Sequence, residues 1–250
     1  MKNRFSGQTA EKIGLLSRLH RIFPCYAWIP AAAISLYNVF VYYGSRLINR
    51  HLPVHILRTP LDDAIPFVPF FILFYILAYL QWGLCYFFSM RENRRLCYET
   101  VTVNLIAKTI CFVCFLVFPT VMVRPALNGN GLWIRLTRWV YATDIPDNLF
   151  PSIHCLESWI AMRALWKVPS VPKPAKLANS LLTLLVCAST VLVKQHFLPD
   201  IVAGILVAEI GYLIVRVGHA DRLPRLLEPA FVKRASGRTG GTSTDIEDCL

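Results

Sequence analysis

Long apolar segments constrain this chain more than any other feature. A bilayer core about 30 Å thick needs about 20 apolar residues in a helix, because no water is present there to satisfy an open backbone. Hydrophobic residues make up 55% of the 250 residues and charged residues only 16%, which excludes a disordered chain and is unlike an ordinary soluble enzyme. We therefore expect an all-α, polytopic membrane protein with six spans, the fourth being short: 26–47, 67–90, 100–123, 153–166, 178–196 and 201–217.

The net charge of +11 raises the question of a nucleic-acid partner. The basic residues do not form one stripe, however, but flank the apolar runs, as they do beside membrane segments. We expect a lipid bilayer around the chain and no nucleic acid. Most of the eight cysteines lie in or beside apolar stretches, which favours buried thiols over disulfides. Cys111 and Cys114 have the spacing of a redox or metal pair, but no second pair accompanies them.

Basic residues also predict the orientation. Eighteen lysines and arginines fall on the side that holds both termini and six on the other, so the positive-inside rule predicts two cytoplasmic termini. We divide the chain into an N-terminal arm (1–24), a membrane domain (25–217) and a Gly/Ser/Thr-rich, disordered tail (218–250). Apolar and basic residues alternate in the arm with the period of an amphipathic helix on the membrane surface, although a plain solvated helix has the same pattern.

This topology brings five distant polar residues to one membrane face. With both termini inside, spans three and five end, and spans four and six begin, on the outer side. Any one polar residue there could simply lie at a helix end close to water. Several together at the edge of the apolar zone indicate a site, because such residues are costly there. The five are Arg124, Ser152, His154, His196 and Asp200.

The two histidines suit different chemical tasks. His196 and Asp200 are separated by a turn containing Pro199, and a carboxylate at this spacing can fix the imidazole tautomer. The other ring nitrogen of His196 is then a nucleophile. His154 provides a second imidazole on another span, suited to protonating a leaving oxygen.

Anion-binding groups accompany the histidines. Pro151 suits the first turn of span four, and we expect the backbone N–H groups of Ser152 and Ile153 to be unpaired and to face outward. Arg124 adds a fixed positive charge with bidentate phosphate geometry. Two histidines, a carboxylate, an arginine and free backbone amides together predict phosphoryl transfer through a phosphohistidine.

Two other chemistries use the same residues. The histidines and Asp200 could ligate zinc or manganese, but no further ligand is obviously placed with them, so we expect no metal and no other cofactor. A serine hydrolase built on Ser152 is a weaker alternative, because Ser152 lies two residues before His154 and faces away from it along a helix.

These residues resemble the three motifs of the type 2 phosphatidic acid phosphatase (PAP2) superfamily. The family pattern is Lys-x6-Arg-Pro, then Pro-Ser-Gly-His, then Ser-Arg-x5-His-x3-Asp. The corresponding segments here are Arg124-Pro125, Phe150-Pro151-Ser152-Ile153-His154 and Ser189-x6-His196-x3-Asp200, within a PAP2-like core at about 100–217. The resemblance implies a six-helix membrane fold and metal-independent cleavage of phosphate esters.

The resemblance also implies roles by position. His196 would be the nucleophile, Asp200 its partner and His154 the acid for the leaving group, while Arg124 and Ser152 would hold phosphate. The helix-start argument above adds the backbone N–H of Ile153 as a phosphate-binding group.

Three positions depart from the family pattern: Val117 replaces the lysine, Ile153 the glycine and Thr190 the arginine. Lys194 is a candidate replacement cation, although at helical spacing it points away from His196. Arg135 and Arg138 in the outer loop are others.

The departures move the sequence toward the branch that resembles inositol phosphorylceramide and sphingomyelin synthases. We therefore expect a lipid phosphate or diphosphate phosphatase with its site on the extracytoplasmic face. A lipid phosphotransferase and a non-catalytic transporter or scaffold are the alternatives. The sequence indicates neither the lipid nor the oligomeric state.

Overall fold

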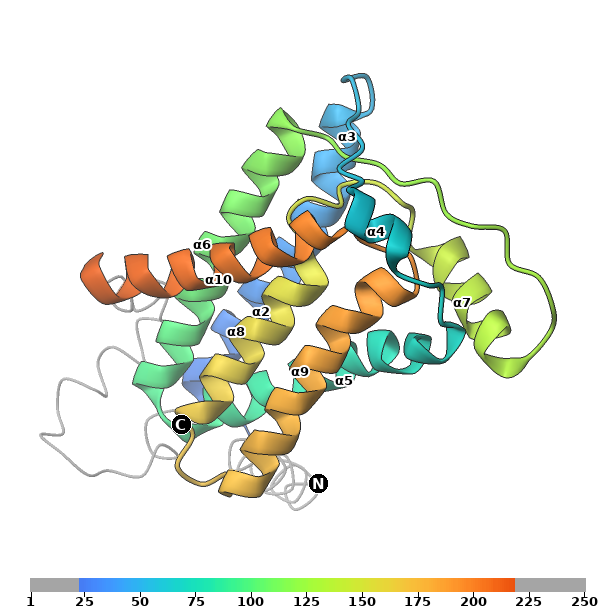
Figure 1. The fold of residues 1–250 in the computed structure, drawn as a ribbon. Helices are drawn as coiled ribbons and strands as arrows, with labels where there is room; N and C mark the ends of the chain where they lie inside the picture. Colours follow the sequence, from blue (N-terminus) through green and yellow to red (C-terminus); the bar gives the residue numbers. More distant parts are fainter. Residues whose placement is uncertain (1–22, 219–250) are drawn as a thin grey trace, which may run out of the picture.

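The structure, a computed structural model, describes residues 23–218 and is helical, with no strand in that range (Figure 1). This confirms the all-α class. Almost all of the predicted N-terminal arm lies outside the described residues. The predicted tail does so too, apart from its first residue. The elements are α2 (Cys25–Val39), the π-helix η1 (Phe40–Gly44), α3 (Ser45–Asn49), α4 (Pro60–Ala64), the 3-10 helix η2 (Pro69–Phe71), α5 (Ile72–Glu92), α6 (Arg94–Val117), α7 (Leu132–Thr143), α8 (Ile153–Trp166), α9 (Lys173–Leu192) and α10 (Leu198–Gly218).

Four helical segments are long and apolar enough to cross a membrane: Pro69–Glu92, Arg94–Val117, Lys173–Leu192 and Leu198–Gly218. They correspond to the second, third, fifth and sixth predicted spans and make the chain a multi-pass membrane protein. The first predicted span is covered by α2, η1 and α3 in succession, and α8 has only 14 residues. The count of six spans therefore stays a prediction.

Two predicted helix ends are wrong, and both lie beside the candidate site. α6 ends at Val117 instead of 123, because Phe118 precedes a proline and leaves the helical region with φ −139°. α9 ends at Leu192 instead of 196, and Lys194 turns the chain with a left-handed φ of 52°. Arg124 and His196 thus lie on connecting segments beyond the helices.

The short helix α8 lies at the centre of the bundle and packs against α5, α6, α9 and α10 (Figure 1). Its buried residues Leu156 and Ile160 share a core cluster with residues of α6 and α10. A Cβ atom placed on Gly204 of α10 would lie 2.5 Å from the carbonyl oxygen of Ser152. The start of α10 is therefore in backbone contact with the start of α8.

A buried ion pair joins α6 to α8 inside the bundle. Lys108 and Glu157 lie 2.8 Å apart and are 0% and 1% exposed. Asn104 and Tyr86 also donate hydrogen bonds to the Glu157 carboxylate. Because an isolated charge is costly inside a membrane, this mutual neutralisation is what allows both residues to lie at this depth.

Candidate active site

The turn between α9 and α10 positions the first histidine. The backbone N–H groups of Gln195 and His196 both donate to the carbonyl of Thr190, at 2.8 and 3.0 Å. His196 Nδ1 lies 3.3 Å from Asp200 Oδ2, and the N–H of Phe197 donates to the same carboxylate oxygen at 2.9 Å. The contact with Asp200 leaves Nε2 as the ring nitrogen available to a substrate.

Electrostatics at this turn favour a charged imidazole. Burial lowers the pKa of His196, but the hydrogen bond to Asp200 and the charge of that carboxylate outweigh burial, so the pKa is raised above its ordinary value. The pair is almost closed to solvent, with His196 8% and Asp200 0% exposed.

The second histidine, His154, lies in the first turn of α8 and is buried. Its ring stacks on Tyr75 at 4.0 Å between centroids, and Tyr79 and Trp82 pack against it. Its Nε2 atom is buried without a hydrogen-bond partner in the described part of the chain. A buried polar atom that nothing satisfies calls for a missing partner, and a bound substrate would provide one.

The two rings are close enough to flank one phosphorus atom. Their centroids are 6.3 Å apart, with 56° between the ring planes. A reacting nitrogen lies about 3 to 3.5 Å from phosphorus before attack. A proton donor lies about 2.6 to 3.2 Å from the leaving oxygen. Both rings line the same cavity, within reach of a single ligand.

Arg124 completes the site from the segment between α6 and α7. Its guanidinium lies 4.4 Å from the centroid of the Tyr141 ring and donates to the carbonyl of that residue at 3.1 Å and to the side-chain oxygen of Gln195. Tyr141 itself donates from its hydroxyl to the carbonyl of Val193 at 2.7 Å. The helix α7 thus holds Arg124 against the histidine turn. Burial lowers the pKa of Arg124, and its Nε atom has no hydrogen-bond partner among the described residues.

Ser152 differs from the sequence expectation. Its backbone N–H was expected to be unpaired, but it donates to the carbonyl of Asp200 at 3.0 Å. Its side chain is fully buried and caps α8 by accepting from the N–H of Cys155 at 3.4 Å. Ser152 therefore ties the second motif to the third. The neighbouring Ile153 lines the cavity described below.

The helical spacing used to predict the direction of Lys194 does not apply, because α9 ends at Leu192. The Lys194 ammonium group donates to the carbonyls of Asp62 and Ile65, at 3.1 and 2.6 Å. The Asp62 carboxylate accepts from the N–H of Leu198 at 2.8 Å. The segment that precedes α5 is thereby fastened to both sides of the histidine turn.

Two cavities meet at the site. The larger, about 510 Å³, is lined by both histidines, Arg124 and Gln195. The smaller, about 410 Å³, contains Lys194 and shares Arg124 and His196 with the larger one. The structure thus brings Arg124, Ile153, His154, Lys194 and His196 to connected cavities, with Ser152 and Asp200 directly behind them.

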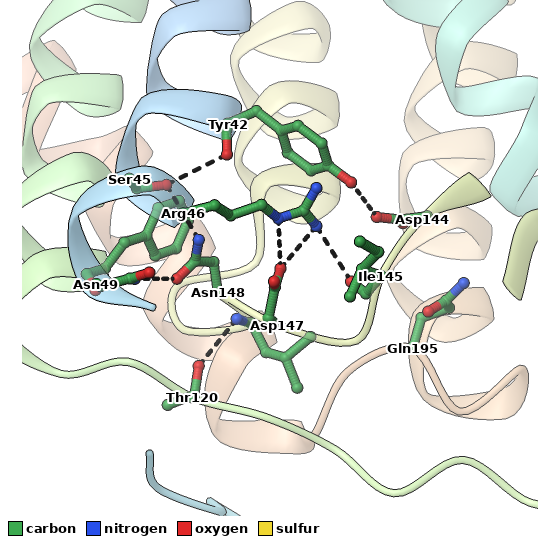
Figure 2. Close-up of polar contacts among 12 residues, drawn as sticks. Tyr42, Ser45, Arg46, Asn49, Thr120, Asp144, Ile145, Asp147, Asn148 and Gln195 are labelled. Atoms are coloured by element: carbon green, nitrogen blue, oxygen red, sulfur yellow. Dashed lines mark hydrogen bonds and ion pairs between the residues drawn. The ribbon is translucent and has the colours of Figure 1, made fainter. Parts of the chain in front are cut away.

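Sequence reasoning missed a carboxylate in the larger cavity. Asp144 follows α7 and accepts a hydrogen bond from the hydroxyl of Tyr42 at 2.8 Å (Figure 2). It also lines the larger cavity and accepts from the hydroxyl of Tyr75 at 2.7 Å. Burial raises its pKa, but the charge of His154 and the two phenols outweigh burial, so the pKa is lowered. The signal in the sequence was an Asp-Ile-Pro-Asp turn shortly before the second motif.

The second aspartate of this turn holds the loop in place. Asp147 forms an ion pair with Arg46 at 2.6 Å, and Figure 2 shows the same guanidinium reaching the carbonyl of Ile145. Next to it, Asn49 donates to the side chain of Asn148 at 2.7 Å. The end of the first helical stretch therefore carries the loop that presents Asp144.

Gln195 was also missed. It is 2% exposed, and its side-chain oxygen accepts the hydrogen bond from Arg124. The position lies inside the third motif but is not one of its named residues, so only the three-dimensional contact reveals it.

The positions that depart from the family pattern contribute no cation. Val117 is 77% exposed at the end of α6, and Thr190 is fully buried, with its hydroxyl donating to the carbonyl of Cys187 at 2.8 Å. Arg138 donates to loop carbonyls, and neither Arg135 nor Arg138 lines the two cavities. The cations that line the two cavities are Arg124, Lys194, Arg58, which pairs with Asp63, and Lys108, which pairs with Glu157.

Comparisons with known proteins agree with these motifs. Searches of curated proteins and of solved structures found no match. A family model described as PAP2 superfamily matches residues 51–214, which include the three motifs and the residues Arg124, His154, His196 and Asp200. The match covers well over half of the chain, and we conclude that this protein belongs to the PAP2 superfamily.

Proposed function

We propose that the protein is a membrane enzyme that cleaves a lipid phosphate or diphosphate through a phosphohistidine intermediate. The observation that carries the proposal is the pairing of His154 and His196 at 6.3 Å around a cavity that Arg124 also lines. Exposed apolar side chains of Val39, Tyr43 and Trp139 line the same cavity, which suits a substrate that approaches from the bilayer.

The reaction has two steps. In the first, Nε2 of His196 attacks phosphorus, the bond from phosphorus to the lipid oxygen breaks, and that oxygen takes its proton from His154. In the second, water attacks phosphorus and gives a proton to His154, while the phosphorus–nitrogen bond breaks and its electrons return to His196. Asp200 holds the His196 tautomer, and Arg124 neutralises charge on the phosphoryl oxygens.

One observation favours a second candidate, a lipid phosphotransferase. Asp144 places a negative charge in the cavity, and the family cations are absent at Val117 and Thr190. A phosphodiester carries less negative charge than a monoester, so it suits such a site better. In this reaction a lipid hydroxyl replaces water in the second step and leaves as a new phosphodiester.

The central experiment assays purified protein in chelator with lipid phosphates alone, and with a phosphodiester donor plus ceramide or diacylglycerol. Phosphate release without acceptor supports the phosphatase, and product that forms only with acceptor supports the transferase. We expect His196→Ala to lower turnover by about 10³-fold or more and to abolish a trapped phosphohistidine, while His51→Ala, an exposed control, retains both. Turnover by H196A at the normal rate would contradict the proposed phosphohistidine mechanism.

Asp144→Asn separates the two candidates further. Removing this charge is expected to favour monoesters, which carry two negative charges, over diesters in kcat/KM. An unchanged ratio of the two kcat/KM values would show that Asp144 does not select substrate charge. Absence of turnover on every donor, in protein that is folded, would favour the scaffold instead.

The orientation belongs to the same proposal. Both termini lie in the cytoplasm and the histidines open on the extracytoplasmic face, as the distribution of basic residues predicts.

A further inference from the structure

A third cavity, of about 700 Å³, lies at the opposite end of the helices from the histidines. It lies where α6 begins and where α8 and α10 end, whereas the histidines lie where α8 and α10 begin. Nothing in the proposed reaction uses this end of the bundle. Its charged lining residues are Arg95, Glu99, Arg163, Lys167, Glu209 and Arg216.

The charges in this cavity do not balance. Lys167 pairs with Glu99, and Arg163 with Glu209, so each carboxylate is already engaged by a cation. The other two cations, both arginines, have no ion-pair partner within residues 23–218. These two, Arg95 and Arg216, leave the cavity with an excess of two positive charges.

Packing holds the two paired cations of the cavity in place. The Arg163 guanidinium and the Lys167 ammonium lie 4.6 and 5.0 Å from the centroid of the Tyr212 ring. Tyr212 is itself buried and donates from its hydroxyl to the carbonyl of Ile160 at 3.1 Å. Cation–π contacts with a fixed ring restrict the side chains that would otherwise move in solvent. One wall of the cavity is therefore held in a fixed position.

The surroundings indicate what kind of anion it is. Leu213 lines the cavity and is 59% exposed, and Val217 beside Arg216 is 71% exposed. Both lie on α10, which is long and apolar enough to span the bilayer. A ligand bound in this cavity can contact cations with its anionic group and apolar side chains with an acyl chain. Basic pockets between membrane helices bind the head groups of anionic lipids in this way.

We propose that this cavity binds the phosphate head group of an anionic phospholipid in the leaflet opposite the histidines. Arg95 and Arg216 contact the phosphate, while Arg163 and Lys167 form the wall behind it. The site is separate from the catalytic one, and the proposal does not rest on the proposed activity. A soluble phosphate ester has the same anionic group without the acyl chains, so the test compares the two sources.

The test measures binding of short-chain phosphatidylglycerol to the full-length protein in neutral detergent, by native mass spectrometry and by the shift in Tm. Short-chain phosphatidylcholine and glycerol phosphate are the comparison ligands. We expect phosphatidylglycerol to bind and raise Tm, and the other two to bind at least tenfold more weakly. For R95Q/R216Q we expect binding weakened by roughly 30-fold, since each basic residue near an anionic membrane surface contributes about 1 kcal/mol.

The matched control is R91Q/K173Q. It removes two exposed charges from the same end of the bundle, outside the cavity, and should bind phosphatidylglycerol as the unmodified protein does. Equal loss in both double variants would overturn the proposal, because the effect would then be general surface charge. Equal binding of phosphatidylcholine would overturn it also, and equal binding of glycerol phosphate would replace the lipid with a soluble ligand.

Discussion

His154 and His196 are the same residue type in two different environments. His196 faces the carboxylate of Asp200, whereas His154 is enclosed by the rings of Tyr75, Tyr79 and Trp82 and has a ring nitrogen without a partner. A nucleophile needs a fixed tautomer, and a proton donor needs an open hydrogen-bonding position. The two surroundings therefore match the two proposed roles.

Asp200→Asn tests the nucleophile through its pH dependence. In the proposed reaction His196 attacks as the neutral imidazole, so kcat/KM is expected to rise as pH increases through its pKa, which Asp200 holds above the ordinary value. Removing the carboxylate charge lowers that pKa, so the acidic limb of the profile should move to lower pH. The maximal rate should fall by roughly 10³-fold, because the tautomer is no longer held.

The control is Glu92→Gln, a carboxylate at the other end of the bundle, which should leave the profile in place. An acidic limb that stays at the same pH in D200N would show that another group controls it.

At the scale of the helices, close approach at α10 determines the geometry of the site. Gly204 faces the carbonyl of Ser152, and Gly211 lies against the backbone of Val103 in α6. Small residues allow membrane helices to approach closely, where packing contacts replace the hydrophobic effect that acts in water.

Gly204→Ala should therefore separate the two motif-bearing helices. Its Cβ atom would lie 2.5 Å from the carbonyl oxygen of Ser152, which must shift. We expect a loss of stability of about 1 to 3 kcal/mol, together with lower kcat, measured by thermal unfolding in detergent and by turnover. Gly83→Ala is the control: nothing lies within 4 Å of a Cβ there, so this variant should be as stable as the original or more so. Equal behaviour of the two variants would contradict the proposed close contact.

The buried pair between α6 and α8 gives a second test at this scale. Lys108→Met or Glu157→Gln leaves a charge at full burial without its counter-charge, and we expect each to cost about 3 to 5 kcal/mol. The double variant K108M/E157Q should be less destabilised than the sum of the two. Strictly additive losses in a double-mutant cycle would show that the pair is not coupled.

For the whole molecule, the sequence predicted where the site residues gather better than how they are held. The ends of apolar runs brought Arg124, His154, His196 and Asp200 to one end of the bundle, and the structure places them there. The apolar pattern predicted two helices that are too long. A helix can stop at a proline or at a left-handed residue while the sequence remains apolar. This is why the helical spacing assumed between Lys194 and His196 does not apply.

The remaining contacts depend on packing that a linear pattern does not contain. Two tyrosines hold Asp144 in the cavity by hydrogen bonds, and they precede it in the sequence by 102 and 69 residues. Lys108 meets Glu157 because α6 and α8 cross at that depth. No motif or spacing in the sequence singles out Gln195 as a site residue.

The predicted topology concerns the whole chain and can be measured directly. We expect a cysteine at exposed Asn128, between α6 and α7, to react with a membrane-impermeant maleimide added outside intact cells. A cysteine at Ser243 should react only after the membrane is opened, as Cys249 should in the unmodified chain. Labelling of the Ser243 position alone from outside would reverse the orientation, and labelling of both positions from the same side would change the number of spans between them.

The hydrogen bond from the Ser152 N–H to the Asp200 carbonyl has a consequence for ligand recognition. It joins, through main-chain atoms alone, the two segments that carry the reactive imidazoles. The spacing between those rings is therefore settled when the chain folds and does not await the arrival of a lipid. Such a preorganised site loses little conformational freedom on binding, so more of the intrinsic interaction energy remains for discriminating between ligands.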